Sequence, residues 1–191
     1  MRKIALVAAA AVTVVSTPAL ANGPYIGIGV THENVAGASG FEGLGFSGIG
    51  GTVFAGYSLP VNESVFVGVE ANFDLSSAKV GDKTAGTEAD HAFGISGRLG
   101  TNLNDKTSLY GRVGYQRGRL GFTANNVTVT KSFDGLRLGA GVQTALTEKV
   151  SLRAEYGRTH YYLNDAERKA LAPRKGGYNN DQFALAVVVG F

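Results

Sequence analysis

The sequence contains no cysteine, and this absence excludes several kinds of chemistry. Without a thiol the chain cannot build a disulfide framework, a thiolate nucleophile or a cysteine zinc site. Its three histidines, His32, His91 and His160, are far apart in the sequence and lack the close spacing of metal ligands. We therefore expect the protein to hold no metal and no cofactor.

Long apolar runs and strong charge are scarce as well. After residue 21 no apolar run reaches 18 residues, so the sequence predicts no transmembrane helix. Charged residues make up 17% of the chain, and the formal net charge is +3. Two of the basic residues, Arg2 and Lys3, lie in the N-terminal segment, and without them the net charge is +1. We therefore predict no nucleic-acid partner.

The N-terminal segment has the three parts of a secretory signal peptide. Arg2 and Lys3 precede a nearly apolar run over residues 4–15, and Ala19-Leu20-Ala21 fits the small-residue cleavage site. The run of 12 residues is shorter than the roughly 20 that a spanning helix needs. We expect cleavage after Ala21, which divides the chain into a signal peptide over residues 1–21 and a single domain over residues 22–191.

Glycine and aromatic residues are abundant, with 28 Gly, 10 Phe and 8 Tyr. Large apolar residues alternate with small ones in several stretches, most clearly at Phe183, Leu185, Val187, Val189 and Phe191. Because successive side chains of a strand point to opposite faces, each such stretch has one apolar face. In a transmembrane barrel that face contacts lipid, while glycine on the other face leaves room for crowded interior side chains.

Eight stretches of this kind are joined by alternately short and long connections. Short turns at one end and long loops at the other are typical of outer-membrane barrels, and lipid requires the sheet to close. The fold class we predict is all-β, an eight-stranded antiparallel up-and-down transmembrane β-barrel. The predicted strands cover residues 25–32, 50–59, 64–75, 91–102, 107–120, 132–146, 150–161 and 183–191, and the predicted long loops cover 33–47, 76–90, 121–131 and 162–179.

A soluble β-sandwich or lipocalin-like barrel is the alternative fold. It would bury the apolar faces and show the other faces to water. Those other faces hold much glycine and alanine and few lysines, which suits a tight lumen better than a solvated surface. The composition therefore favours the membrane barrel.

Several short motifs follow one another along the predicted strands. They are Phe54-Ala55-Gly56-Tyr57, Val67-Gly68-Val69-Glu70 before Phe73-Asp74, Gly97-Arg98-Leu99-Gly100, Leu109-Tyr110-Gly111-Arg112, Arg153-Ala154-Glu155-Tyr156 and the final Phe191. In order and spacing they resemble the OmpA-like family of eight-stranded outer-membrane barrels, over almost all of the chain after residue 21. Because the sequence ends at Phe191, it is similar to the barrel-only members, including adhesion and opacity types, and not to those with a peptidoglycan-binding domain.

The resemblance implies how the protein reaches its place. It implies localisation in the bacterial outer membrane and insertion by the outer-membrane assembly machinery. In that family the machinery reads a terminal aromatic residue with alternating hydrophobic residues before it. The insertion signal would then be Phe183, Leu185, Val187, Val189 and Phe191.

Charged residues on the inward faces form the main candidate site. Glu70 and Arg98 lie on neighbouring predicted strands, each about five residues from the periplasmic end, so we expect them to pair. The resemblance implies a salt-bridge plug in the lumen, and Gln143 stands where a second carboxylate of that plug is usual. The candidate plug residues are Glu70, Arg98, Arg112, Arg137, Arg153 and Glu155. They fit either a filled polar core or a narrow, gated ion path.

Basic residues near the outer end are candidates for lipid contacts. Arginine grips phosphate by two parallel hydrogen bonds, which suits lipopolysaccharide. The same residues also fit an ordinary solvated loop. The candidates are Arg158, Arg168, Lys169, Arg174 and Lys175.

These features predict a monomeric outer-membrane barrel with a structural or surface-interaction, adhesion-like role carried by extracellular loops. Its expected partners are outer-membrane lipids, lipopolysaccharide and the assembly machinery. A small gated ion channel or porin is the first alternative. A lipid A-modifying enzyme ranks last, because Thr159 and His160 face opposite sides of their strand and no His-x-Ser pair is present. We therefore expect no enzymatic activity.

Overall fold

The computed structural model describes residues 23–37, 46–81, 85–124, 127–162 and 178–191. The predicted signal peptide and its cleavage after Ala21 lie outside the described residues and stay a prediction. The strands are β1 (Gly23–Gly37), β2 (Phe46–Pro60), β3 (Val65–Ser76), β4 (Lys79–Gly81), β5 (Ala85–Asn102), β6 (Thr107–Ala124), β7 (Val127–Ala145), β8 (Val150–Tyr162) and β9 (Tyr178–Gly190).

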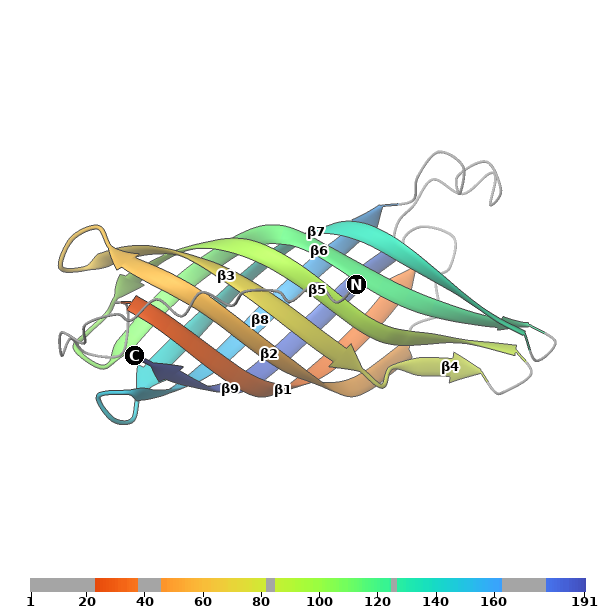
Figure 1. The fold of residues 1–191 in the computed structure, drawn as a ribbon, viewed down its shortest axis with the longest axis horizontal. Coiled ribbons are helices and arrows are strands. Elements are labelled where there is room, and N and C mark those ends of the chain that lie inside the picture. The colour runs from red at the N-terminus through yellow and green to blue at the C-terminus, as the bar shows by residue number, and fades with distance from the viewer. Residues whose placement is uncertain (1–22, 38–45, 82–84, 125–126, 163–177) are drawn as a thin grey trace, which may run out of the picture.

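Eight of these strands close into an antiparallel barrel (Figure 1). β1 pairs with β2 on one side and with β9 on the other. β3 pairs directly with β5, and the short β4 pairs with the start of β5. The predicted fold class is therefore confirmed. None of the described segments forms a helix long and apolar enough to cross a membrane.

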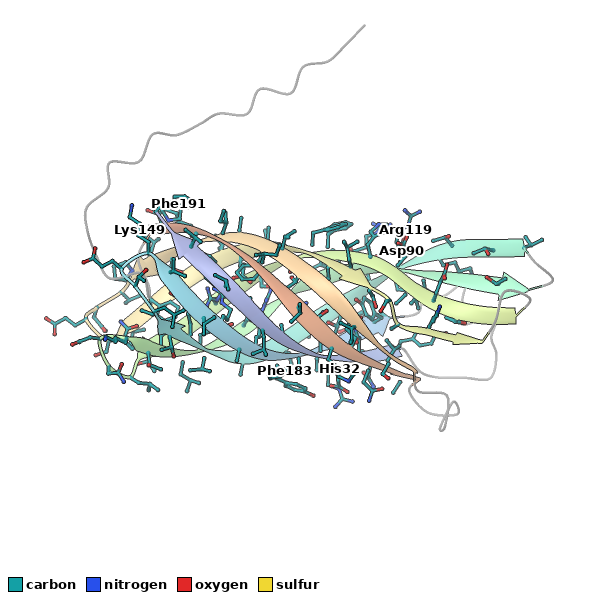
Figure 2. All side chains as sticks on the ribbon, turned by 90° about the horizontal axis from the view of Figure 1, so that it is seen from below. His32, Asp90, Arg119, Lys149, Phe183 and Phe191 are labelled. Carbon is teal, nitrogen blue, oxygen red and sulfur yellow. The ribbon has the colours of Figure 1, made fainter. Side chains whose placement is uncertain are left out.

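The barrel has an apolar outside and a mainly polar inside. Large apolar side chains project from the outer surface all around the wall (Figure 2), and alternate residues of each strand are buried inside. The predicted facing is confirmed for the last strand, where Phe183, Leu185 and Val187 are exposed outside and Ala184 and Ala186 are buried inside.

The three short turns share one construction. The side-chain oxygens of Asn62, Asn104 and Thr147 each accept hydrogen bonds from the backbone N–H groups two and three residues later. A side chain of this kind satisfies backbone donors that a tight turn would otherwise leave free. The turns therefore form locally and set the register of the hairpins, in agreement with their predicted positions.

Two predicted long loops prove to be mainly strand. Of the predicted loop 76–90, β4 and the start of β5 are paired strands. The predicted loop 121–131 is wrong in the same way, because β6 and β7 continue to the pair Ala124 and Val127. Val127 and Val129 alternate with Thr128 and Thr130, and these β-branched residues fit paired strands. Thr123 Oγ1 lies 2.9 Å from Thr128 Oγ1.

Inside the wall, an aromatic ring repeatedly covers a glycine on the next strand. The opposed pairs are Tyr25 and Gly56, Gly27 and Phe54, Phe66 and Gly100, Tyr110 and Gly141, and Gly135 and Tyr161. In each pair a Cβ on the glycine would run into the ring that lies over it. A narrow lumen thus accommodates large rings because the opposite position is empty.

Two glycines of β5 allow a direct test. At Gly100 a Cβ would overlap the Phe66 ring, whereas at Gly97 the nearest atom is the Val113 carbonyl oxygen at 4.0 Å. We expect Gly100→Ala to lower the free energy of unfolding by about 1–3 kcal/mol through overpacking. Gly97→Ala should stay within about 0.5 kcal/mol of the parent. Urea unfolding in lipid vesicles, followed by the gel mobility of folded and unfolded protein, measures both, and equal losses would contradict this explanation.

Candidate functional site in the barrel lumen

Strand alternation brings the six predicted plug residues together inside the barrel. All six are buried, and they come from β3, β5, β6, β7 and β8. The members are Glu70, Arg98, Arg112, Arg137, Arg153 and Glu155. We call this set, together with Asp74, the lumen network.

Glu70 is the centre of the network and is 1% exposed. Its Oε2 atom lies 2.5 Å from Nη1 of Arg153 and 3.5 Å from Nη1 of Arg98. Its Oε1 atom lies 3.1 Å from Nη1 of Arg112. The hydroxyl of Tyr25 donates a hydrogen bond of 2.8 Å to Oε2. One carboxylate therefore joins three guanidinium groups from three different strands.

Glu155 and Asp74 continue the network. Nη1 of Arg112 lies 2.8 Å from Glu155 Oε1, and Nη2 of Arg137 lies 3.4 Å from the same oxygen. Nη1 of Arg137 lies 3.0 Å from Asp74 Oδ2. Because Arg112 also contacts Glu70, the chain Glu70, Arg112, Glu155, Arg137 and Asp74 runs without a break across the lumen.

Gln143 occupies the position where the resemblance implied a second carboxylate. Its Oε1 atom accepts hydrogen bonds of 3.1 and 3.0 Å from Nε and Nη2 of Arg153. The amide therefore holds the part of the guanidinium that Glu70 does not reach. A neutral partner here leaves Arg153 committed to a single carboxylate.

Aromatic rings also belong to this site, and the sequence pattern did not predict them. The guanidinium of Arg98 lies 3.9 Å from the centre of the Tyr110 ring, and that of Arg153 lies 4.4 Å from the Phe54 ring. Such stacking stabilises a buried cation. Tyr110 also donates a hydrogen bond of 2.6 Å to Glu155. Inward alternation was the one available signal, and it does not distinguish these rings from ordinary filling.

The buried charges of the described barrel are equal in number. Four carboxylates and four guanidinium groups are buried there, and the members are Glu33, Glu70, Asp74, Glu155, Arg98, Arg112, Arg137 and Arg153. A buried charge is costly without a partner, so an equal number of opposite charges suits a water-poor lumen.

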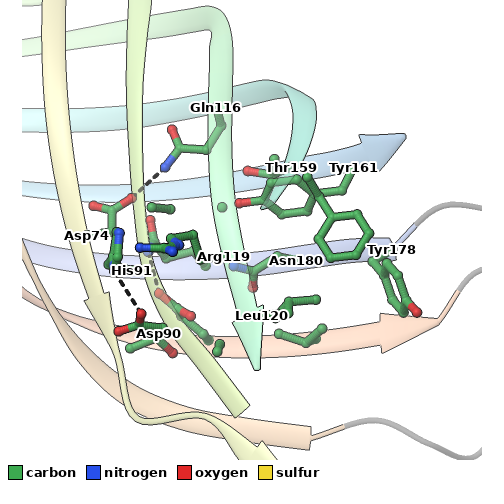
Figure 3. Close-up of a pocket in the computed structure, with 18 of the residues that line it drawn as sticks. Asp74, Asp90, His91, Gln116, Arg119, Leu120, Thr159, Tyr161, Tyr178 and Asn180 are labelled. Atoms are coloured by element: carbon green, nitrogen blue, oxygen red, sulfur yellow. Dashed lines mark hydrogen bonds and ion pairs between the residues drawn. The ribbon is translucent and has the colours of Figure 1, made fainter. Parts of the chain in front are cut away.

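Two cavities remain in the lumen. The lower cavity, of about 20 Å³, lies among Glu70, Asn72, Arg112 and Glu155. The upper cavity, of about 40 Å³, lies toward the end where β6 and β7 extend (Figure 3). Asp74, Arg137 and Gln182 line both cavities and lie between them.

Two of the three histidines lie at the outer end of the wall beside a polar side chain. His91 Nδ1 lies 3.0 Å from Asp90, and His160 Nδ1 lies 2.7 Å from Asn179 Oδ1. Within the part of the chain that the structure describes, no three residues of the kinds that bind metals lie close enough to hold an ion.

The candidate lipid contacts are only partly described. Arg158 is exposed outside β8, and its Nε atom lies 3.6 Å from Asp181, to which Tyr156 donates a hydrogen bond of 2.6 Å. The same arrangement recurs two strands away, where Arg117 and Tyr115 contact Asp134. The remaining candidates, Arg168, Lys169, Arg174 and Lys175, lie outside the described residues.

The contacts of Glu70 predict that the stability of the barrel depends strongly on this residue. We expect Glu70→Gln to lower the free energy of unfolding by about 3–5 kcal/mol, because three guanidinium groups lose their shared carboxylate. The matched control is Glu63→Gln in an exposed turn, which should change it by less than about 0.5 kcal/mol. Urea unfolding in lipid vesicles compares the two, and a loss for Glu70→Gln no larger than the control's would contradict the role of the network.

Comparison with known proteins agrees with this architecture. The family model described as outer membrane protein beta-barrel domain matches residues 7–191. A 22 kDa outer membrane protein of Rhizobium leguminosarum bv. viciae is 28% identical over 148 residues, which cover 75% of this chain and 67% of the relative.

Two solved structures share the fold. Neisserial surface protein A has a TM-score of 0.63 at 16% identity, covering 90% of this chain and 99% of that one. Ail, the attachment invasion locus protein of Yersinia pestis, has a TM-score of 0.59 at 18% identity, covering 88% of this chain and 98% of that one. The closed eight-stranded wall, its apolar outer face and the match to the family model together place this chain in the outer membrane protein β-barrel domain family.

Proposed function

We propose that this outer-membrane protein acts in contacts at the cell surface, through the sheet that β4, β5, β6 and β7 form beyond the barrel wall. The observation that carries the proposal is the length of the β6–β7 hairpin. β7 pairs with β8 only from Asp134 onward, whereas it pairs with β6 back to Val127. The hairpin therefore projects past its neighbour (Figure 1).

Within the described part of the chain, the projecting part of β7 has one edge without a partner strand. Residues 127–132 pair with β6 on one side, and none of the described residues pairs with them on the other. Proteins commonly protect such edges with several charges or proline, but Lys131 is the single charged residue here. An exposed edge of this kind suits the addition of an extended segment from a partner protein.

The direction of the projection supports an extracellular position. Short turns of outer-membrane barrels lie in the periplasm, and the β6–β7 hairpin lies at the opposite end from the three short turns. The fold neighbour Ail is described as an attachment invasion locus protein, and a structure of it contains the heparin analogue sucrose octasulfate. A contact role is therefore reasonable for this fold, with either a protein or a sulfated glycan as the partner to be tested.

Shortening the hairpin tests the contact role. Leu120 and Lys131 are opposite each other, so replacing residues 121–130 by an Asn-Gly turn keeps the register of the barrel. We expect cells displaying the parent protein to be retained on casein-coated surfaces, and cells displaying the shortened protein to be retained at the level of cells that lack it.

The control keeps the hairpin intact. Glu63→Gln changes an exposed turn at the other end of the barrel, so retention should remain within about twofold of the parent. Retention that persists after shortening would contradict the role of the hairpin. Retention on heparin-coated surfaces alone would assign the contact to a glycan and not to an added strand.

Lipids of the outer membrane are the second class of partner. Tyr115 and Tyr156 are exposed on the outer face, as expected of an aromatic girdle at the membrane surface, and Arg117 and Arg158 follow two residues further along their strands. Arg158 and its counterpart Arg117 are therefore the described candidates for lipopolysaccharide phosphate. Insertion by the assembly machinery would use the exposed Phe183, Leu185, Val187 and Phe191 and the half-buried Val189.

The lumen network fits a plug that supports the wall. Asp74, Arg137 and Gln182 lie between the two cavities, and below them the rings of Phe66 and Tyr110 are buried. This packing favours a structural role over the alternative of a gated channel.

Planar bilayers distinguish these roles. The folded protein should give no resolved conductance steps, because the network fills the path between the cavities. Glu70→Ala and Arg98→Ala test the channel alternative directly. Steps in the parent protein that change with either substitution would favour a gated channel.

A further inference from the structure

The upper cavity has a lining that the plug does not use. It is enclosed by β1, β3 and β5 to β9, and its volume of about 40 Å³ corresponds to roughly three water positions. Gln116 and Asp74 meet on one side of it, and Tyr161 and Tyr178 lie on the other (Figure 3). A ligand that fits here has to be small and has to match both a polar and an aromatic surface.

Glu33 is the residue of the cavity lining that most indicates which ligand would bind. It is 3% exposed, and it is the one buried carboxylate of the described lumen for which no ion pair is found. Its Oε1 atom accepts one hydrogen bond of 2.8 Å from Nε2 of Gln182. Ser76 is a second neutral hydrogen-bonding neighbour of this carboxylate. Neutral donors compensate a buried carboxylate poorly, and none of the described residues forms an ion pair with Glu33.

The nearest guanidinium is already committed. Arg137 contacts Asp74, Glu155 and Gln182 through its two terminal nitrogens. Among the buried residues of the lining, two carboxylates, Glu33 and Asp74, face one guanidinium group, that of Arg137. The lining therefore favours a cation.

The aromatic side of the cavity indicates which kind of cation. The rings of Phe133 and Tyr178 meet edge to face, with their centres 5.7 Å apart, and Tyr161 lies beside them. Ring faces attract ammonium groups and pack against alkyl groups. A divalent metal ion prefers six or more oxygen ligands, and the described residues offer no such cluster.

We propose that the upper cavity binds a small organic ammonium ion. Glu33 is its counter-ion, and the rings of Phe133, Tyr161 and Tyr178 surround its alkyl part. The side-chain amide of Gln182 should respond to binding. Its Nε2 atom donates a hydrogen bond to Glu33, and its Oε1 atom accepts one from Arg137. The floor formed by Asp74, Arg137 and Gln182 makes this a binding site and not a passage.

Methylammonium chloride is the probe for the test, with sodium chloride at equal ionic strength as the comparison. The folded barrel is titrated in detergent micelles, and the side-chain amide resonances of Gln182 are followed by NMR. We expect a saturable shift with methylammonium and none with sodium. Glu33→Gln should weaken binding at least tenfold, and Glu63→Gln, in an exposed turn, should leave it unchanged.

Phe133→Leu keeps the bulk of the side chain and removes the ring, and it should weaken binding several-fold while Glu33 is still present. This variant decides the matter if Glu33→Gln fails to give the heat-sensitive gel mobility of a folded barrel. An equal response to sodium would overturn the proposal. So would binding that neither Glu33→Gln nor Phe133→Leu weakens.

Discussion

The narrow interior is the constraint on which the rest of the structure depends. Eight strands leave a lumen just wide enough for side chains, so each inward position must either fill space or yield it. The rings of Tyr25, Phe54, Phe66 and Tyr110 are accommodated because a glycine stands opposite each of them. The arginines also fill space beside these rings. The Arg98 guanidinium lies against the Tyr25, Phe66 and Tyr110 rings. The same contacts therefore fill the lumen and stabilise its buried charges.

Lipid outside the wall changes what holds the fold together. The large apolar residues face outward, so only small groups of buried apolar residues remain inside. The polar network therefore makes most of the specific contacts that join strands across the lumen. Arg112 is shared by Glu70 and Glu155, and Arg137 by Glu155 and Asp74, which links β3 to β6, β7 and β8. In a low-dielectric lumen such linked hydrogen bonds and ion pairs strengthen one another.

Much of the wall could be predicted from the sequence, because strand alternation sorts residues into two faces. The facing of Glu70 and Arg98 and their expected pairing agree with the structure, since both lie on adjacent strands. Arg153 reaches Glu70 from β8, which is not a neighbour of β3, and that contact depends on how the barrel closes. The start of β7 was predicted as a loop because threonine and asparagine are abundant in and just before it, although Val127 and Val129 alternate with threonine and the segment pairs with β6.

The outward residues of β6 and β7 change in composition along the hairpin, from a part that faces lipid to a part that projects beyond the wall. Up to Tyr115 and Leu136 the outward residues are those that lipid requires. Beyond them Arg117 and Asp134 pair, and β7 continues with serine, lysine and threonine and with two exposed valines, Val127 and Val129. Above the membrane no lipid selects an apolar face, so the length of the projection needs another cause. The proposed contact role would supply one, because no described residue pairs with the other edge of β7 over residues 127–132.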